Sequence, residues 1–113
     1  MITTHVLDLA NGLPARGVSV VLEVEVERSN EWKTVGRGAT DENGRLVTLA
    51  QGWDRAPGTY RLTFDLWGYH RERGLTQPFF PSATVTFTVH DTAEHYHVPL
   101  LISPFGYSTY RGS

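Results

Sequence analysis

The sequence predicts an all-β protein, an antiparallel β-sandwich with one short helix. Apolar and polar residues alternate with a period of two over several stretches, which is typical of strands with one buried face. Clusters of Gly, Pro, Asn and Asp separate these stretches at short intervals, as turns between strands do. One stretch, residues 66–77, breaks the alternation. Many short strands with one helix favour a sandwich.

The first half of the chain contains one strong strand and three shorter candidates. In residues 17–29, GVSVVLEVEVERS, alternate positions form an apolar face of Val20, Leu22, Val24 and Val26. Serine and glutamate lie mostly on the other face, so this strand is expected to be half-buried. Shorter strands are expected at residues 3–9, 31–37 and 45–48.

The second half repeats the alternation on both sides of the predicted helix. Residues 59–66, TYRLTFDL, and residues 83–90, ATVTFTVH, each carry an apolar side chain at every second position. Between them, residues 66–77 hold several good helix formers. Gly74 then provides a stop signal, and two prolines follow.

The strand predicted at residues 95–102, HYHVPLLI, has an unusual second face. Its core face consists of Tyr96, Val98, Leu100 and Ile102. The opposite face carries His95, His97, Pro99 and Leu101. A face that mixes histidines with leucine suggests cover by another subunit. Residues 105–111 are expected to form the last strand.

Length, charge and composition limit which classes of protein and which partners are expected. The chain has 113 residues, which predicts a single domain over residues 1–113. The net charge of −2 and the lack of basic runs argue against a nucleic-acid partner. The absence of cysteine fits a reducing compartment, and we expect a cytoplasmic protein. The N-terminus does not look like a signal peptide, and no apolar run is long enough for a membrane span.

The motifs of common catalytic and metal sites are weak or missing. His95 and His97 form a His-x-His pair on one strand face, but no third ligand is evident nearby, so no metal is expected. No Gly-x-Ser-x-Gly elbow or Gly-rich phosphate loop is present, and no cofactor is expected. His70 and His90 are expected at the surface.

Four segments resemble one family, the transthyretin-related 5-hydroxyisourate hydrolases. The segments are HVLD at residues 5–8, GLPARGVSVVLE at 12–23, TDENGR at 40–45, and HYHVPLL with SPFGYSTYRGS at the C-terminus. The resemblance spans the whole chain and implies a transthyretin-like sandwich of two four-stranded sheets. It also implies a homotetramer, a dimer of dimers, with active sites at the dimer–dimer interface.

The resemblance implies an activity and a set of site residues. The activity is hydrolysis of 5-hydroxyisourate to 2-oxo-4-hydroxy-4-carboxy-5-ureidoimidazoline in urate catabolism. The implied catalytic residues are His5, Arg45, His97 and Ser113, and the implied substrate-binding residues are His5, Arg45, Tyr110 and Arg111. Histidine suits proton transfer because its ordinary pKa of roughly 6.5 lies near working pH. Which histidine is the base and which the acid stays open.

Two other interpretations compete with the hydrolase. A transthyretin-like carrier would bind an aromatic small molecule in the central channel, but two histidines, an arginine and the YRGS end argue against apolar channel walls. A structural sandwich with no site would leave His5 as a strand residue, Arg45 as a solvated turn residue and Ser113 as a frayed end.

Overall fold

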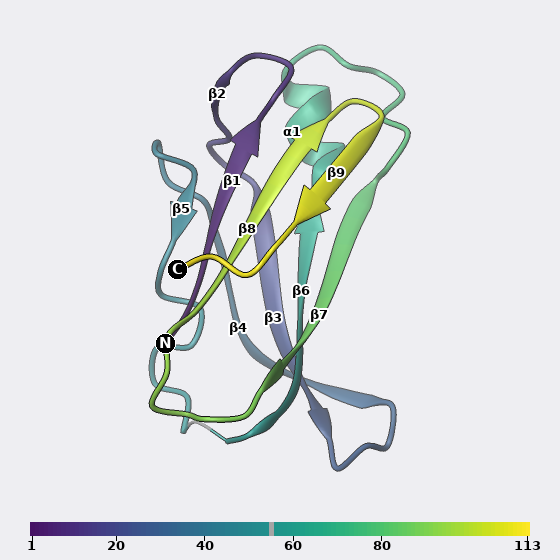
Figure 1. Ribbon diagram of the computed structural model, residues 1–113. Coiled ribbons are helices and arrows are strands. Elements are labelled where there is room, and N and C mark those ends of the chain that lie inside the picture. The colour runs from purple at the N-terminus through teal and green to yellow at the C-terminus, as the bar shows by residue number, and fades with distance from the viewer. Residues whose placement is uncertain (55) are drawn as a thin grey trace.

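The computed structural model describes residues 1–54 and 56–113, and it shows two β-sheets packed face to face (Figure 1). Among these residues, the first sheet has five strands: β1 (Ile2–Asp8), β2 (Leu13–Pro14), β5 (Arg45–Leu46), β8 (Tyr96–Ser103) and β9 (Gly106–Thr109). Over the same residues the second sheet has four strands, in the order β4 (Glu31–Ala39), β3 (Ser19–Val26), β6 (Gly58–Asp65) and β7 (Ser82–Val89). A short helix, α1 (Leu66–Glu72), follows β6. The predicted two-sheet sandwich with a short helix is confirmed.

The first sheet adds two features to the predicted antiparallel arrangement. β1 and β8 pair in parallel, with Thr3 opposite His97, which is possible because the chain crosses the second sheet between them. The other edge of β1 is covered by two-residue strands. β5 pairs with the middle of β1 and β2 pairs with its end, and these short pieces bring the described strands of this sheet to five.

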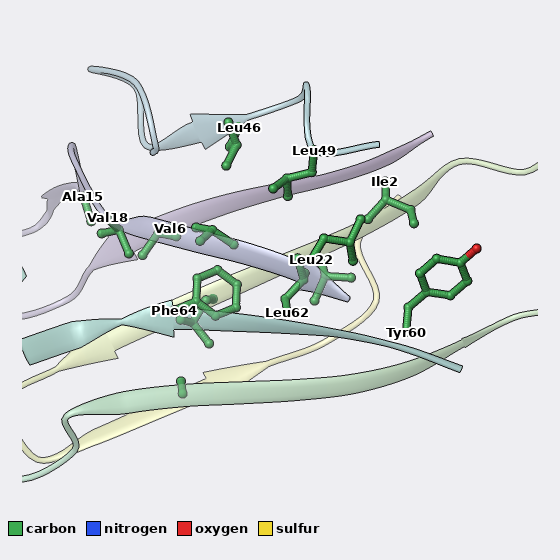
Figure 2. Close-up of a cluster of buried hydrophobic side chains, with 14 of the residues drawn as sticks. Ile2, Val6, Ala15, Val18, Leu22, Leu46, Leu49, Tyr60, Leu62 and Phe64 are labelled. Carbon is green, nitrogen blue, oxygen red and sulfur yellow. The ribbon is translucent and has the colours of Figure 1, made fainter. Parts of the chain in front are cut away.

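The core consists of the inward-facing side chains that the alternation predicted. Leu22 from β3 and Leu62 and Phe64 from β6 are fully buried, and Figure 2 shows them meeting Val6 of β1 between the sheets. Val26 is an exception, with 40% of its surface exposed. It lies beyond the last residue of β3 that pairs with β6, where the β3–β4 hairpin extends past the sandwich (Figure 1).

The helix begins and ends where the sequence indicated. The Asp65 side chain caps the N-terminus by accepting a hydrogen bond from the Gly68 amide at 3.1 Å. Gly74 adopts a φ of +90° just after the helix, a conformation that favours glycine. Leu66, Tyr69 and His70 form the buried face of the helix.

The burial of His70 corrects the expectation that it lies at the surface. The residue is 6% exposed, because positions 66, 69 and 70 share the helix face that packs on the sandwich. Its Nε2 has no hydrogen-bond partner among the described residues. Burial therefore lowers the pKa of His70, and the Arg73 charge adds to this, although the nearby Asp8 opposes it. His90, in contrast, is exposed as expected.

Asp8 connects the helix to the end of β1. Its carboxylate accepts hydrogen bonds from the Tyr69 hydroxyl at 2.7 Å, the Asn11 side-chain amide at 2.9 Å and two backbone amides. Burial raises the pKa of Asp8, but these hydrogen bonds outweigh it, so the pKa lies below the ordinary value. Burial and the bond to Asp8 raise the pKa of Tyr69 to about 12. Asp8 is therefore a structural carboxylate that fixes α1 to the first sheet.

Because the His70 imidazole is buried, we expect the protein to lose stability in mild acid. Because the pKa of His70 is lowered by folding, the unfolded state binds a proton that the folded state excludes, so the free energy of unfolding falls as the pH drops below about 6.5. The contribution of His70 is at most about 1.4 kcal/mol per pH unit. Denaturant unfolding between pH 7.5 and 5.5 should show a shallower fall for His70→Leu than for the unchanged protein. His90→Gln is the matched control, and equal slopes in all three proteins would contradict the assignment.

Candidate active site

The outer face of the first sheet brings the predicted site residues together. Strand pairing puts His5 of β1 opposite Arg45 of β5, and Thr3 of β1 opposite His97 of β8. Thr3 and His5 are two residues apart on one strand, so their side chains share a face. That face points away from the core, since the intervening Thr4 is fully buried. Three segments distant in sequence therefore converge, as Figure 1 shows for β5, β1 and β8.

The loop before β5 holds Arg45 and orients His5. The Asp41 side chain accepts hydrogen bonds from the backbone amides of Asn43 at 2.8 Å and Arg45 at 2.9 Å. Gly44 has a φ of +74°, and its carbonyl accepts a hydrogen bond from the Val6 amide at 2.8 Å, which fixes the loop to β1. The amide of Arg45 lowers the pKa of Asp41, together with the Asn43 amide and the charges of Arg45 and His5. The DENGR segment thus forms a rigid turn beside β1.

The same loop fixes the tautomer of His5. The Nε2 atom of His5 lies 2.9 Å from the carbonyl oxygen of Asn43. A carbonyl oxygen can only accept, so Nε2 carries the proton, and in the neutral ring Nδ1 keeps a lone pair. His5 is half-buried and Arg45 is exposed. His5 can therefore present an acceptor nitrogen beside the guanidinium-bearing strand.

His97 is held by a buried hydroxyl. The Oγ1 atom of Thr3, a residue only 3% exposed, lies 2.7 Å from Nδ1 of His97. Burial lowers the pKa of His97, and the charges of Arg45, His95 and His5 lower it further. The ring is therefore neutral at neutral pH, and Nε2 is the nitrogen left for chemistry.

Residues 110–113, which we call the tail, lie directly against His97. Gly112 forms an isolated bridge with His97, and its amide donates a hydrogen bond to the His97 carbonyl at 2.8 Å. A Cβ atom at Gly112 would lie 2.5 Å from Cδ2 of His97 and 3.2 Å from Cγ of Pro99. A side chain at this position would force the imidazole or the tail to move. The tail also explains why Pro99 is buried although it faces outward.

The remaining predicted residues of the tail are placed differently. The Arg111 guanidinium lies 3.4 Å from the Glu94 carboxylate and 4.8 Å from the centre of the Tyr96 ring, on the side opposite the His97 face. Tyr110 is 59% exposed, and Ser113 is exposed beside Gly112. The structure thus brings together His5, Arg45, His97 and the Gly112 backbone, while Arg111 contacts Glu94.

Sequence reasoning missed Thr3, Asn43 and the contact of His95 with Thr3, and it gave Gly112 of the YRGS segment no role of its own. Thr3 lies two positions before His5 on the same strand face, and this spacing was the only sequence pattern that could have pointed to it. That Thr3 meets His97 depends on the β1–β8 register.

No group of three or more His, Cys, Asp or Glu side chains in residues 1–54 and 56–113 is arranged to hold a metal ion. Within the same residues, α1 is too short and too polar to cross a bilayer, and no other helix qualifies.

Known proteins resemble this chain over nearly its whole length. The model of the HIUase/Transthyretin family matches residues 2–112. The 5-hydroxyisourate hydrolase of Salmonella dublin is 45% identical over 113 residues, which are 100% of this chain and 81% of that protein. The structure of Klebsiella pneumoniae 5-hydroxyisourate hydrolase is 34% identical with a TM-score of 0.85, over 99% of this chain and 97% of the other.

A thyroxine-bound transthyretin has the same fold. Sea bream transthyretin in complex with thyroxine is 30% identical with a TM-score of 0.89, over 98% of this chain and 93% of that one. The resemblance inferred from the sequence motifs is confirmed, and this chain belongs to the HIUase/Transthyretin family.

Proposed function

We propose that this protein hydrolyses 5-hydroxyisourate to 2-oxo-4-hydroxy-4-carboxy-5-ureidoimidazoline, using His5, Arg45 and His97. The observation that carries the proposal is the convergence of these three side chains on one outer sheet face. The similarity to the Salmonella and Klebsiella hydrolases over nearly the whole chain supports the same reaction.

The geometry suggests a role for each side chain in opening the ring amide. His97 is neutral and has Nε2 available, so it takes a proton from water as the water oxygen bonds to the ring carbonyl carbon. Arg45 stabilises the negative charge that develops on the carbonyl oxygen. When the carbon–nitrogen bond breaks, the imidazolium returns its proton to the leaving nitrogen. The carboxylic acid that forms then loses the second water proton to solvent, and the product is a carboxylate.

The other predicted residues complete the proposed site. His5 accepts a hydrogen bond at Nδ1 from the substrate or the attacking water, since Nε2 is directed to Asn43. Tyr110 and Arg111 bind substrate, and Ser113 contributes its hydroxyl to catalysis. For Arg111 this role requires exchange of its contact with Glu94, which is feasible because the side chains are 58% and 50% exposed.

Assembly and location extend the proposal. A homotetramer would cover the part of the outer face that holds the half-buried Leu7 and Leu101. The absence of cysteine supports a cytoplasmic setting. The carrier alternative draws support from the fold shared with the thyroxine-bound transthyretin. Polar, ionisable groups on the same face favour the hydrolase.

A direct assay distinguishes the hydrolase from the carrier. We expect this protein, purified with a free C-terminus, to accelerate the loss of freshly generated 5-hydroxyisourate, followed by ultraviolet absorbance, well above its spontaneous decay. Light scattering on the same preparation should give four times the mass of one chain. A decay rate unchanged by saturating protein would leave the carrier interpretation ahead.

A further inference from the structure

A single hydroxyl lies between two imidazoles beside the proposed site. The Oγ1 atom of Thr3 is 2.8 Å from Nε2 of His95 and 2.7 Å from Nδ1 of His97. Thr3 is buried, His97 is half-buried and His95 is exposed. The two rings lie 6.1 Å apart between centroids and are bridged by this hydroxyl. The arrangement forms a hydrogen-bonded path from the site to solvent.

The hydroxyl gives this path a direction. It has one proton to donate, so it donates to one ring and accepts from the other. In one state His97 Nδ1–H donates to Thr3, Thr3 donates to His95 Nε2, and Nε2 of His97 is a free base. In the other state both bonds reverse, and Nε2 of His97 carries a proton.

Proton movement along the path would relocate positive charge. When Nε2 of His97 accepts a proton, the Nδ1 proton can pass to Thr3 while the hydroxyl proton passes to Nε2 of His95. One proton enters the path and one reaches the far end, so the atoms balance and no bond between heavy atoms changes. The result is a neutral His97 and an imidazolium at His95, which is solvent-exposed.

We propose that His95 is a positioning residue that acts through Thr3 to set the tautomer of His97 and to connect it to solvent. This inference rests on the proposed hydrolase function, because it assigns His97 as the base. Two of the groups that face His97, Arg45 from β5 and His5 from β1, disfavour a positive charge on this ring and so favour moving it outward, and His95 from β8 itself is the group that receives it. In the tail, Gly112 lies against the edge of the His97 ring.

Three variants separate the relay from simple packing. Thr3→Val keeps the β-branched shape but removes the hydroxyl, and Thr3→Ser restores it. His95→Gln keeps a hydrogen-bonding group at an exposed position but cannot accept a relayed proton. We expect Thr3→Val and His95→Gln to lower kcat about tenfold with little change in KM, as loss of one positioning hydrogen bond would, and Thr3→Ser to recover most of the rate.

Readouts that do not depend on packing complete the test. The solvent deuterium isotope effect on kcat should fall in Thr3→Val and His95→Gln, since fewer protons move with the base. Nitrogen-15 chemical shifts of labelled histidine, recorded without substrate from pH 5 to 8, should show Nδ1–H as the main His97 tautomer. His95→Gln should change that tautomer ratio or the His97 titration midpoint.

The outcomes distinguish the relay from the proposed reaction. Altered His97 shifts in a protein with no hydrolase activity would support the coupling and reject the reaction. Full hydrolase activity, an unchanged isotope effect and unchanged His97 shifts in His95→Gln would overturn the relay while leaving the reaction intact. Thr3→Ser behaving like Thr3→Val would also overturn it, because the hydroxyl would then be irrelevant.

Discussion

Replacing His97 with alanine will lower kcat for 5-hydroxyisourate by about 10²–10⁴-fold, the usual contribution of a general acid–base group. The reason is that the structure offers His97 Nε2 as a neutral nitrogen whose ring is fixed at Nδ1 by Thr3. His5→Ala should also reduce turnover strongly, because it removes the second imidazole of the face. Steady-state kinetics of the ultraviolet assay measures both effects.

We expect His97→Ala and His5→Ala to fold normally, so that a loss of activity can be assigned to the missing imidazole. Both histidines face away from the core, so circular dichroism and light scattering should match the unchanged protein. His90→Ala is the control, since this histidine is exposed at the end of β7, where none of the site residues lies. Near-full activity in both His5→Ala and His97→Ala would refute the assignment of the site.

The acid limb of the rate profile should reflect the neutral state of His97. Because burial and the charges of Arg45, His95 and His5 lower the pKa of His97, the base stays unprotonated to a lower pH than an ordinary histidine. We therefore expect kcat/KM, whose pH dependence reports the free enzyme, to fall with acidification at a midpoint below about 6.5. A pH profile with its midpoint above that value would indicate that another group acts as the base.

Alternation in the sequence was enough to predict the sheet faces. Val98, Leu100 and Ile102 are buried as expected, and the same parity placed His97 on the outer face. A period of two is a local property, so it can be detected without knowing the partner strand. The inward faces of β3 and β6 followed for the same reason.

Contacts between distant segments could not be predicted in this way. The side chain of Thr3 meets His97 only because β1 and β8 pair in parallel with one particular register, and no local pattern encodes a register between strands more than 90 residues apart. Considered alone, Arg45 would be interpreted as a solvated turn residue. Only the family resemblance identified it as a candidate site residue. His70 was misassigned because the buried face of a short helix is decided by what packs on it.

We expect one added methyl group at Gly112, in the YRGS segment, to have a large effect on kcat. In Gly112→Ala the new Cβ would lie 2.5 Å from Cδ2 of His97, so either the imidazole or the tail must move. A misplacement of about 1 Å in a catalytic group can cost about 10²-fold in rate, and we expect kcat to fall by that order. Thermal stability should change little, because the tail lies at the edge of β8 and outside the core.

Two further variants show whether the loss acts through His97. Gly106→Ala is the matched control, because its Cβ would meet only Ser103 Oγ at 3.7 Å, and activity should be retained. In a His97→Ala background, Gly112→Ala should cost almost nothing more, since residues in contact give non-additive effects. A full additional 10²-fold loss in the double variant would mean that the tail acts on substrate or assembly and not on the ring it touches. The close approach of Gly112 to His97 therefore leads to a definite kinetic expectation: the YRGS segment positions the His97 imidazole, although it is not adjacent to β8 in sequence.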